Sequence, residues 1–149
     1  MVDSGEYLWQ CLKYVELNMV RCGVVRHPRD WQWSGYGELM GLRKRNRLLD
    51  VEKLLWLLRV GEVEEFRVHL DSNLAETIAK DQLKREAKWT EALAVGSGGF
   101  VEQINANLVN RRRTECKEET GTWVLREADA SFFGAKNEAL GRFAETNLR

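Results

Sequence analysis

The stretch VEEFRVHLDSNLAETIAK, residues 63–80, is the clearest structural signal in the sequence and indicates a helical protein. Its large apolar residues recur every four positions, at Phe66, Leu70, Leu74 and Ile78. This spacing places them on one face of an amphipathic α-helix and leaves the acidic and polar residues on the other face. We therefore expect a helix over residues 63–80 that packs its apolar face into a core.

A second, strongly apolar helix is expected just before this one. Asp50 can cap its first turn, the apolar pattern continues through Arg59, and Gly61 is a residue type that commonly ends helices. The run Leu54 to Leu58 is apolar at every position, which is more than one buried face needs.

The N-terminal segment predicts a third helix, from about Ser4 to Cys22. Asp3 followed by Glu6 resembles a capping box, and Gly23 is a natural residue just past a helix C-terminus. One face of this helix is expected to pack into the core and carries Leu8, Leu12, Val15, Met19 and Cys22.

A second face of the same helix carries polar residues of chemical interest. Tyr14, Asn18 and Arg21 follow one another along it, with Gln10 one turn before. A tyrosine can act as a nucleophile, an amide oxygen can help to hold a divalent ion, and an arginine can neutralise a phosphate. The alternative interpretation is a tyrosine packed at the helix edge beside two solvated polar residues.

The rest of the chain gives weaker signals. Residues 24–47 are expected to be irregular, because His27-Pro28 disfavours helix before the proline. The later predicted elements are helices over 89–95 and 100–108, a strand over 122–126 and a weakly patterned helix over 135–147. The two helices would form either a helix-turn-helix or an ordinary helical hairpin. The expected fold class is mainly α, a small helical bundle with at most one short strand or hairpin near the C-terminus.

Composition narrows the class of protein. With 149 residues, 44% of them hydrophobic, and one proline, the chain suits one globular unit or two small ones. No apolar run approaches a membrane span and the first residues are acidic and polar, so we expect no membrane association and a cytoplasmic location. Three cysteines without a CxxC pair favour reduced thiols over a disulfide framework or a zinc site.

The net charge of zero conceals an uneven distribution. Residues 1–60 carry a net charge of +3, because they hold ten Lys or Arg and seven Asp or Glu. Two basic clusters stand out, Arg43-Lys44-Arg45 with Arg47, and Arg111-Arg112-Arg113. Such clusters either bind phosphates, releasing counterions, or are solvated linkers. Two interpretations are likewise open for the aromatic residues Trp31, Trp33 and Tyr36. They either stack on unpaired bases or cover a core.

Residues 14–31, YVELNMVRCGVVRHPRDW, resemble the signature of the REP-associated tyrosine transposases, a branch of the HUH single-strand nucleases. That signature reads Tyr-[Ile/Val]-x-x-Asn-[Pro/Met]-Val-Arg-x-Gly-x-Val-x-His-Pro-x-x-Trp, and it fixes roughly ten positions of the eighteen. WSGY at residues 33–36 matches it as well. KWTEALAVGSGGFVEQI at 88–104 resembles the downstream region of longer members, and GTWVLRE at 121–127 does so more weakly.

The resemblance implies a specific chemistry. Tyr14 matches the nucleophile that attacks a phosphodiester of single-stranded DNA and leaves a 5′-phosphotyrosine bond. Mg²⁺ or Mn²⁺ would polarise that phosphate. In the family this ion is held by a His-hydrophobic-His pair on a sheet strand and by a polar residue one turn after the tyrosine. Asn18 matches that polar residue. Arg21 matches a position that we interpret as phosphate-facing.

The chain departs from this family at the metal site. Its only histidines are His27 and His69, and neither has a second histidine two positions away. We expect His27 to fix its turn and His69 to be a partly exposed helix residue. A divalent ion held by Asn18 alone would bind weakly, and Glu16 lies about 200° around the helix from Tyr14.

In the family the histidine pair lies on a ferredoxin-like sheet upstream of the tyrosine helix. The resemblance therefore implies a remnant of an α+β transposase whose sheet is missing. Residues 1–47 would hold the tyrosine helix and the His-Pro-x-x-Trp segment, and residues 48–149 an accessory helical region.

The first hypothesis is a truncated, transposase-like protein that binds single-stranded or hairpin DNA and is not catalytic alone. Its DNA-binding residues would be Arg21, Arg26, Arg43, Lys44, Arg45, Arg47, Arg111, Arg112 and Arg113. The alternative is a non-catalytic helical module that binds another protein through Leu54 to Leu58. A third hypothesis is a chain that completes a catalytic site with a partner chain supplying the missing sheet.

Overall fold

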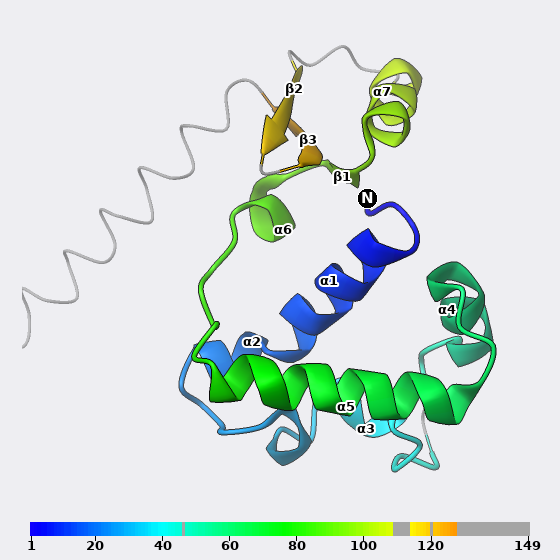
Figure 1. Cartoon of the computed structure of the whole chain (residues 1–149), viewed down its shortest axis with the longest axis vertical. Helices are drawn as coiled ribbons and strands as arrows, with labels where there is room; N and C mark the ends of the chain where they lie inside the picture. Colours follow the sequence, from blue (N-terminus) through cyan, green and yellow to red (C-terminus); the bar gives the residue numbers. More distant parts are fainter. Residues whose placement is uncertain (46, 109–113, 120, 128–149) are drawn as a thin grey trace, which may run out of the picture. The chain divides into compact units, whose positions relative to one another are not determined.

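The computed structural model describes residues 1–45, 47–108, 114–119 and 121–127 (Figure 1). The described residues form two compact units, one of residues 2–86 and one of Met1 with the described residues between 87 and 127. The boundary predicted at residue 47 follows from the family resemblance and stays a prediction. The predicted helix at 135–147 and the cluster Arg111 to Arg113 lie outside the described residues.

The unit of residues 2–86 is built from helices, as predicted. In chain order they are α1 (Glu6–Glu16), α2 (Asn18–Arg21), the 3-10 helix η1 (Pro28–Asp30), α3 (Tyr36–Leu39), α4 (Val51–Leu58) and α5 (Val63–Ala79). Two of these, η1 and α3, lie in a segment for which the sequence predicts no regular structure. The buried core of the unit contains Leu17, Val20, Tyr36, Leu39, Leu58, Phe66, Leu70 and Leu74.

Helix α5 is the helix that the four-residue spacing predicts. Phe66, Leu70 and Leu74 are fully buried, and Ile78 packs against the same core. Trp9 of α1 packs against Phe66 with ring centroids 5.3 Å apart. Figure 1 shows α5, in green, running past one end of α1. The helix that bears Tyr14 is therefore held by α5.

Helix α4 begins at its predicted cap and ends earlier than predicted. The Lys53 N–H donates to Asp50 Oδ1 at 2.9 Å, which satisfies a donor in the first turn. Arg59, the last residue of the predicted helix, takes a left-handed conformation with φ of 59° and ends α4, so Arg59 has the role that the prediction gave to Gly61.

The predicted helix of residues 4–22 is divided in two at Leu17. Helix α1 ends at Glu16 and α2 begins at Asn18. The predicted capping box is also wrong, because Gly5 is the N-cap residue and no side chain caps the first turn of α1.

The division changes which residues face the core. Leu8 and Leu12 pack against it as predicted, but Val15 is 58% exposed and Cys22 is exposed. Leu17 and Val20 are buried instead. The break at Leu17 shifts the helix face for the residues that follow it, such as Cys22, whereas Val15 lies before the break and is exposed within α1 itself.

The other unit contains a three-stranded antiparallel sheet. Its elements are α6 (Lys88–Glu91), β1 (Ala94–Gly96), α7 (Gly98–Asn107), β2 (Thr114–Glu119) and β3 (Thr122–Glu127). The strand order is β1-β3-β2, with Val95 opposite Val124 and Cys116 opposite Leu125. Strand β3 confirms the strand predicted at 122–126, whereas the limit of one strand or hairpin is wrong. The fold as a whole is mainly α, as predicted.

The predicted helix over 89–95 is wrong, because residues 94–96 form β1. A strand between α6 and α7 leaves no helix-turn-helix within residues 89–108. Helix α7 starts at Ser97, whose Oγ accepts from the Phe100 N–H at 3.4 Å. Val101 of this helix and Leu125 of β3 are buried in one cluster. Among the described residues, no helix combines the length and the apolarity needed to cross a bilayer.

Candidate functional site

Three of the predicted site residues meet at the junction of α1 and α2. The guanidinium carbon of Arg21 lies 3.9 Å from the centre of the Tyr14 ring. Arg21 Nη1 donates to Asn18 Oδ1 at 3.2 Å, and Nη2 donates to the Tyr14 carbonyl oxygen at 3.0 Å. The helical spacing thus brings Tyr14, Asn18 and Arg21 together, although the helix breaks between them.

Arg21 acts here as a residue that positions Tyr14. The Tyr14 carbonyl lies in the last turn of α1, where helix carbonyls need donors from outside the helix, and Arg21 supplies one. A guanidinium over an aromatic face adds about 0.5 to 1 kcal/mol at an exposed site. Both terminal nitrogens of Arg21 are engaged within the chain, so a phosphate at this position would have to share their donors.

A pocket of about 310 Å³ opens beside the tyrosine. Tyr14 and Arg21 line it together with two further cations, Lys13 and Lys84. Its other polar lining residues are Gln10, Gln82, Thr77, Glu6 and Glu86. The three cations exceed the two carboxylates, so the pocket carries a small positive charge and offers hydrogen-bonding groups to an anion.

The residues beside Tyr14 do not fit the Mg²⁺ or Mn²⁺ that the resemblance implies. Asn18 Oδ1 already accepts a hydrogen bond from the Arg21 guanidinium, and a divalent cation at this oxygen would face that positive charge. Mg²⁺ prefers an octahedral shell of oxygen ligands with carboxylates or phosphates among them. In the described part of the chain, no three His, Cys, Asp or Glu side chains form a metal-binding group.

The His-Pro-x-x-Trp segment forms a separate network that fixes the local fold. His27 Nδ1 accepts from the Arg29 N–H and from Arg29 Nε, which holds the turn at η1. Burial, followed by the positive charge of Arg29, lowers the pKa of His27. Tyr36 donates from its hydroxyl to Asp71 Oδ1 at 2.6 Å, and Arg29 pairs with the same carboxylate at 3.5 Å.

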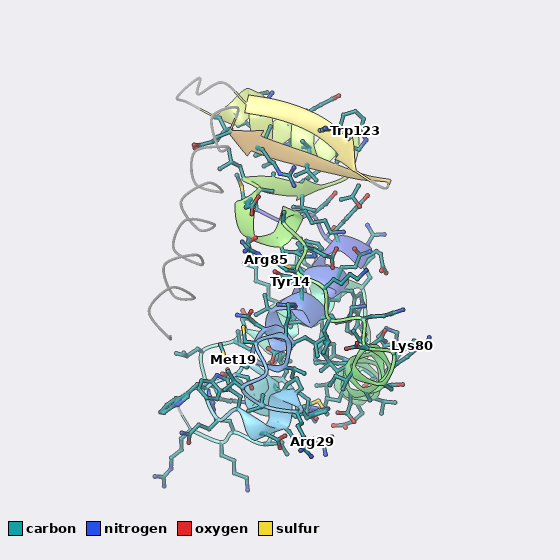
Figure 2. The ribbon with its side chains drawn as sticks, turned by 90° about the vertical axis from the view of Figure 1, so that its left-hand side faces the viewer. Tyr14, Met19, Arg29, Lys80, Arg85 and Trp123 are labelled. Atoms are coloured by element: carbon teal, nitrogen blue, oxygen red, sulfur yellow. The ribbon has the colours of Figure 1, made fainter. Side chains whose placement is uncertain are left out.

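This network is distinct from the Tyr14 pocket. Figure 2 shows Tyr14 and Arg29 well apart along the unit. Burial and the hydrogen bond to Asp71 raise the pKa of Tyr36 to about 12, so its phenol stays protonated. Tyr36 is buried in the core, so of the two interpretations given for this residue, base stacking or covering the core, the second is the one that fits. His69, exposed as expected, packs the edge of its ring on Trp9.

Glu16 is a buried acid to which the sequence assigns no role. Its side chain is 5% exposed, and its Oε2 has no hydrogen-bond partner. Burial raises the pKa of Glu16 to about 7, although a hydrogen bond from the Tyr36 backbone N–H acts in the opposite direction. A Cβ at Gly35 would lie 2.6 Å from Glu16 Oε1, so a larger residue at position 35 would have to displace this carboxylate. The pairing of Glu16 with the glycine of WSGY is long-range, and helical periodicity cannot reveal it.

The predicted basic residues are distributed over the surface of the 2–86 unit. Arg26, Lys44, Arg45 and Arg47 are exposed, and Arg43 is half-buried. None of these five residues lines the Tyr14 pocket, whereas Arg21 does.

The apolar run of α4 is used mainly within the fold. Leu58 is buried, and Leu54 and Leu55 pack against the same core. Trp56 is the exception, with 75% of its surface exposed. The surface expected for a protein-binding helix therefore reduces largely to one tryptophan.

The residues of the transposase-like motif form connected structure within one unit. Tyr14 contacts Arg21, Glu16 accepts from the Tyr36 backbone, and His27 packs edge-on to the Tyr36 ring at 5.4 Å. Comparison with protein-family models, with curated proteins and with solved structures found no match to this chain. The functional assignment therefore depends on the motif residues and on the geometry around Tyr14.

Proposed function

We propose that this chain is a transposase-like protein that binds single-stranded or hairpin DNA and does not cut DNA by itself. The observation that carries the proposal is the Arg21 guanidinium held over the Tyr14 ring, at a pocket that also contains Lys13 and Lys84. The resemblance of residues 14–31 supports it. The enzymes of that family nick and rejoin single-stranded DNA through a phosphotyrosine during DNA transposition.

Phosphate binding is the chemistry for which the pocket is best equipped. The ammonium groups of Lys13 and Lys84 can pair with phosphate oxygens, and Gln10 and Gln82 can donate hydrogen bonds to a phosphate or a base. Its volume is at the lower end of the range for small-molecule sites and suits one nucleotide. The carboxylates of the same pocket reduce its net charge, so binding should be moderate and sensitive to salt.

Strand cleavage requires more than a tyrosine. The phosphodiester must be activated, in this family by a divalent ion, before a phenol can displace an oxygen from it. Asn18 is engaged with Arg21, and the sequence lacks the His-hydrophobic-His pair. Tyr14 therefore lies in a site that can bind a phosphate, and among the described residues no three His, Cys, Asp or Glu side chains gather to hold an activating metal.

Binding can be tested with a labelled single-stranded DNA hairpin at several salt concentrations. We expect affinity to fall as salt rises, because each phosphate paired by the protein releases a counterion. Replacing both pocket lysines (Lys13→Gln with Lys84→Gln) should weaken binding by about tenfold and make the logarithmic salt slope shallower by about 1.4. Lys53→Gln, at an exposed lysine of α4, is the control and should change little. A flat salt response, or no binding at low salt, would contradict the proposal.

The predicted lack of cleavage has its own test. Incubation of the full chain with Mn²⁺ and labelled single-stranded DNA should give no covalent adduct after denaturing electrophoresis. Tyr14→Phe should bind the hairpin as the unchanged chain does, since the phenol oxygen contributes no charge to the pocket. An adduct that forms with the natural chain and disappears in Tyr14→Phe would show that the chain is an active nuclease.

The hypothesis of a partner chain that supplies the sheet stays a prediction. Val15 lies next to Tyr14 in α1 and is 58% exposed, so it is a residue that such a partner would cover. The protein-interaction hypothesis is less favoured, because the core takes most of the apolar run in α4.

A further inference from the structure

The turn after η1 carries an aromatic residue that the core does not use. Trp33 is 74% exposed, whereas Trp31 in the same segment is half-buried and Tyr36 is buried. Exposure alone does not mark a contact surface, so the significance of Trp33 depends on the residues beside it.

Trp33 lies against the first basic cluster. A surface hollow of about 550 Å³ is lined by Trp33, Leu42, Arg43, Lys44 and Arg45. Three of these five residues are cations and none is an acid. The combination of one exposed indole with three positive charges is typical of surfaces that bind unpaired nucleotides.

The basic segment is held in place where it leaves α3. Gly41 has φ of 71°, and the N–H groups of Leu42 and Arg43 both donate to the Gly37 carbonyl at 2.8 Å. A Cβ at Gly41 would collide with the Arg67 guanidinium, whose Nε donates to the Leu39 carbonyl at 3.2 Å. Glycine at position 41 thus meets both a conformational and a spatial requirement.

Two further contacts keep the segment beside Trp33. Arg43 Nη2 donates to the Gln32 carbonyl, the residue before Trp33, at 2.5 Å. Beyond the cluster, the Leu49 N–H donates to the buried Glu38 carboxylate at 2.6 Å. Hydrogen bonds from the Leu48 and Leu49 backbone lower the pKa of Glu38, so it is ionised at neutral pH. The cations are therefore placed before a ligand arrives, which reduces the entropy lost on binding.

We infer that Trp33 and the segment Leu42 to Arg45 form a stacking platform for an unpaired nucleotide of single-stranded DNA. The base lies on the indole face, and the neighbouring phosphates pair with Lys44 and Arg45. Arg43 holds the platform together through Gln32. This inference rests on the proposed function, because it adds a second contact area for the same ligand, with no lining residue in common with the Tyr14 pocket.

Single-stranded DNA fits this surface better than duplex DNA or a membrane does. In a duplex the bases are already stacked and their faces cannot reach an indole. An amphipathic helix inserts an apolar face into the membrane interface, whereas residues 42–45 form no helix. Stacking of one base on one aromatic residue corresponds to about 5- to 100-fold in affinity.

The test compares two tryptophans of equal exposure in the full chain. Trp33→Ala should weaken binding of a fluorescein-labelled oligothymidylate, followed by anisotropy, by about 5- to 100-fold, and Trp33→Phe should recover most of it. Trp56→Ala is the matched control, because Trp56 is 75% exposed on α4 and lies outside the hollow. An abasic strand of the same length should bind equally to the natural chain and to Trp33→Ala. Circular dichroism verifies that each variant keeps its helical content.

The outcomes separate this inference from the proposed function. If the natural chain binds no single strand at low salt, both are wrong. If it binds and Trp33→Ala binds equally well, the platform is wrong and the Tyr14 pocket remains. A last experiment measures the binding of the natural chain and of Trp33→Ala to vesicles of phosphatidylserine and phosphatidylcholine. Loss of vesicle binding in Trp33→Ala, with DNA binding unchanged, would assign the surface to a membrane and overturn the platform.

Discussion

Phe66→Ala is expected to lower the free energy of unfolding of the helical unit by about 3 to 5 kcal/mol. Phe66 is fully buried, and its ring packs against Trp9 of α1. Removing the ring loses its transfer free energy and leaves a cavity between α5 and α1. Thermal unfolding followed by circular dichroism should show a midpoint about 15 to 30 °C lower.

Two further variants make this prediction decisive. Val68→Ala lies on the same helix at a position that is 70% exposed, and it should change stability by less than about 0.5 kcal/mol. Phe66→Leu retains most of the side-chain volume and replaces Phe66→Ala in the experiment if that variant does not fold. Its expected loss in the free energy of unfolding is about 1 kcal/mol. A similar, small loss for Val68→Ala and Phe66→Ala would mean that α5 does not hold the tyrosine helix.

This packing bears on the proposed origin of the chain. In the transposases that the motif resembles, a sheet covers the tyrosine helix. Here Leu8, Trp9 and Leu12 of α1 pack into the core formed with α4 and α5. The tyrosine helix thus has an internal partner, and the polar face with Tyr14 and Arg21 remains at the pocket.

Local signals predicted the parts of the fold that depend on local spacing. The four-residue repeat of Phe66, Leu70 and Leu74 defined α5, and Asp50 defined the start of α4. The positions 14, 18 and 21 were correctly placed together, because i, i+4 and i+7 share a helix face even across a one-residue break.

Long-range packing decided what the sequence could not reveal. At the C-terminal end of α1, Val15 is exposed and Glu16 is buried, against the hydrophobicity of both residues. Strand β1 is three residues long and strand β2 is rich in charge, so neither shows the alternation that marks a strand. Both exist because β3 pairs with them on its two edges.

The candidate site likewise combines features that the sequence shows with features that depend on long-range packing. The basic cluster was evident from composition, but its placement against Trp33 depends on the Arg43 bond to Gln32 and on the left-handed Gly41. For Glu16, the helical spacing predicts only that it lies on the side of the helix opposite Tyr14, and it does not predict its burial. It is buried against Gly35, and this burial raises the pKa of Glu16 to about 7.

Glu16→Gln is expected to stabilise the protein at neutral and alkaline pH. The pKa of Glu16 is raised to about 7 in the folded chain from an ordinary value of 4.5. Between these two values the folded chain binds the proton more tightly than the unfolded chain, so stability falls as pH rises through this window. Above pH 7 the full cost of the buried carboxylate is present, about 3 kcal/mol. Glutamine keeps the acceptor for the Tyr36 N–H and carries no charge.

The measurement is urea unfolding of the natural chain and of Glu16→Gln between pH 4 and pH 8. The stability difference should be near zero at pH 4 and should grow to about 3 kcal/mol by pH 8. His27 acts in the opposite sense, because its lowered pKa makes stability rise with pH below 6.5. His27 is present in both proteins, so its contribution cancels in the difference.

Glu38→Gln is the matched control, since Glu38 is also a buried glutamate, with 3% of its surface exposed. Its carboxylate accepts from the Leu49 backbone and its pKa is lowered, so its charge stabilises the fold above pH 4.5. Glu38→Gln should therefore destabilise the chain at neutral pH, in the direction opposite to Glu16→Gln. Equal effects of the two substitutions, or a stability difference for Glu16→Gln that does not change with pH, would show that the Glu16 carboxylate is solvated. In that case Gly35 would have no carboxylate to accommodate, and alanine at position 35 should be tolerated.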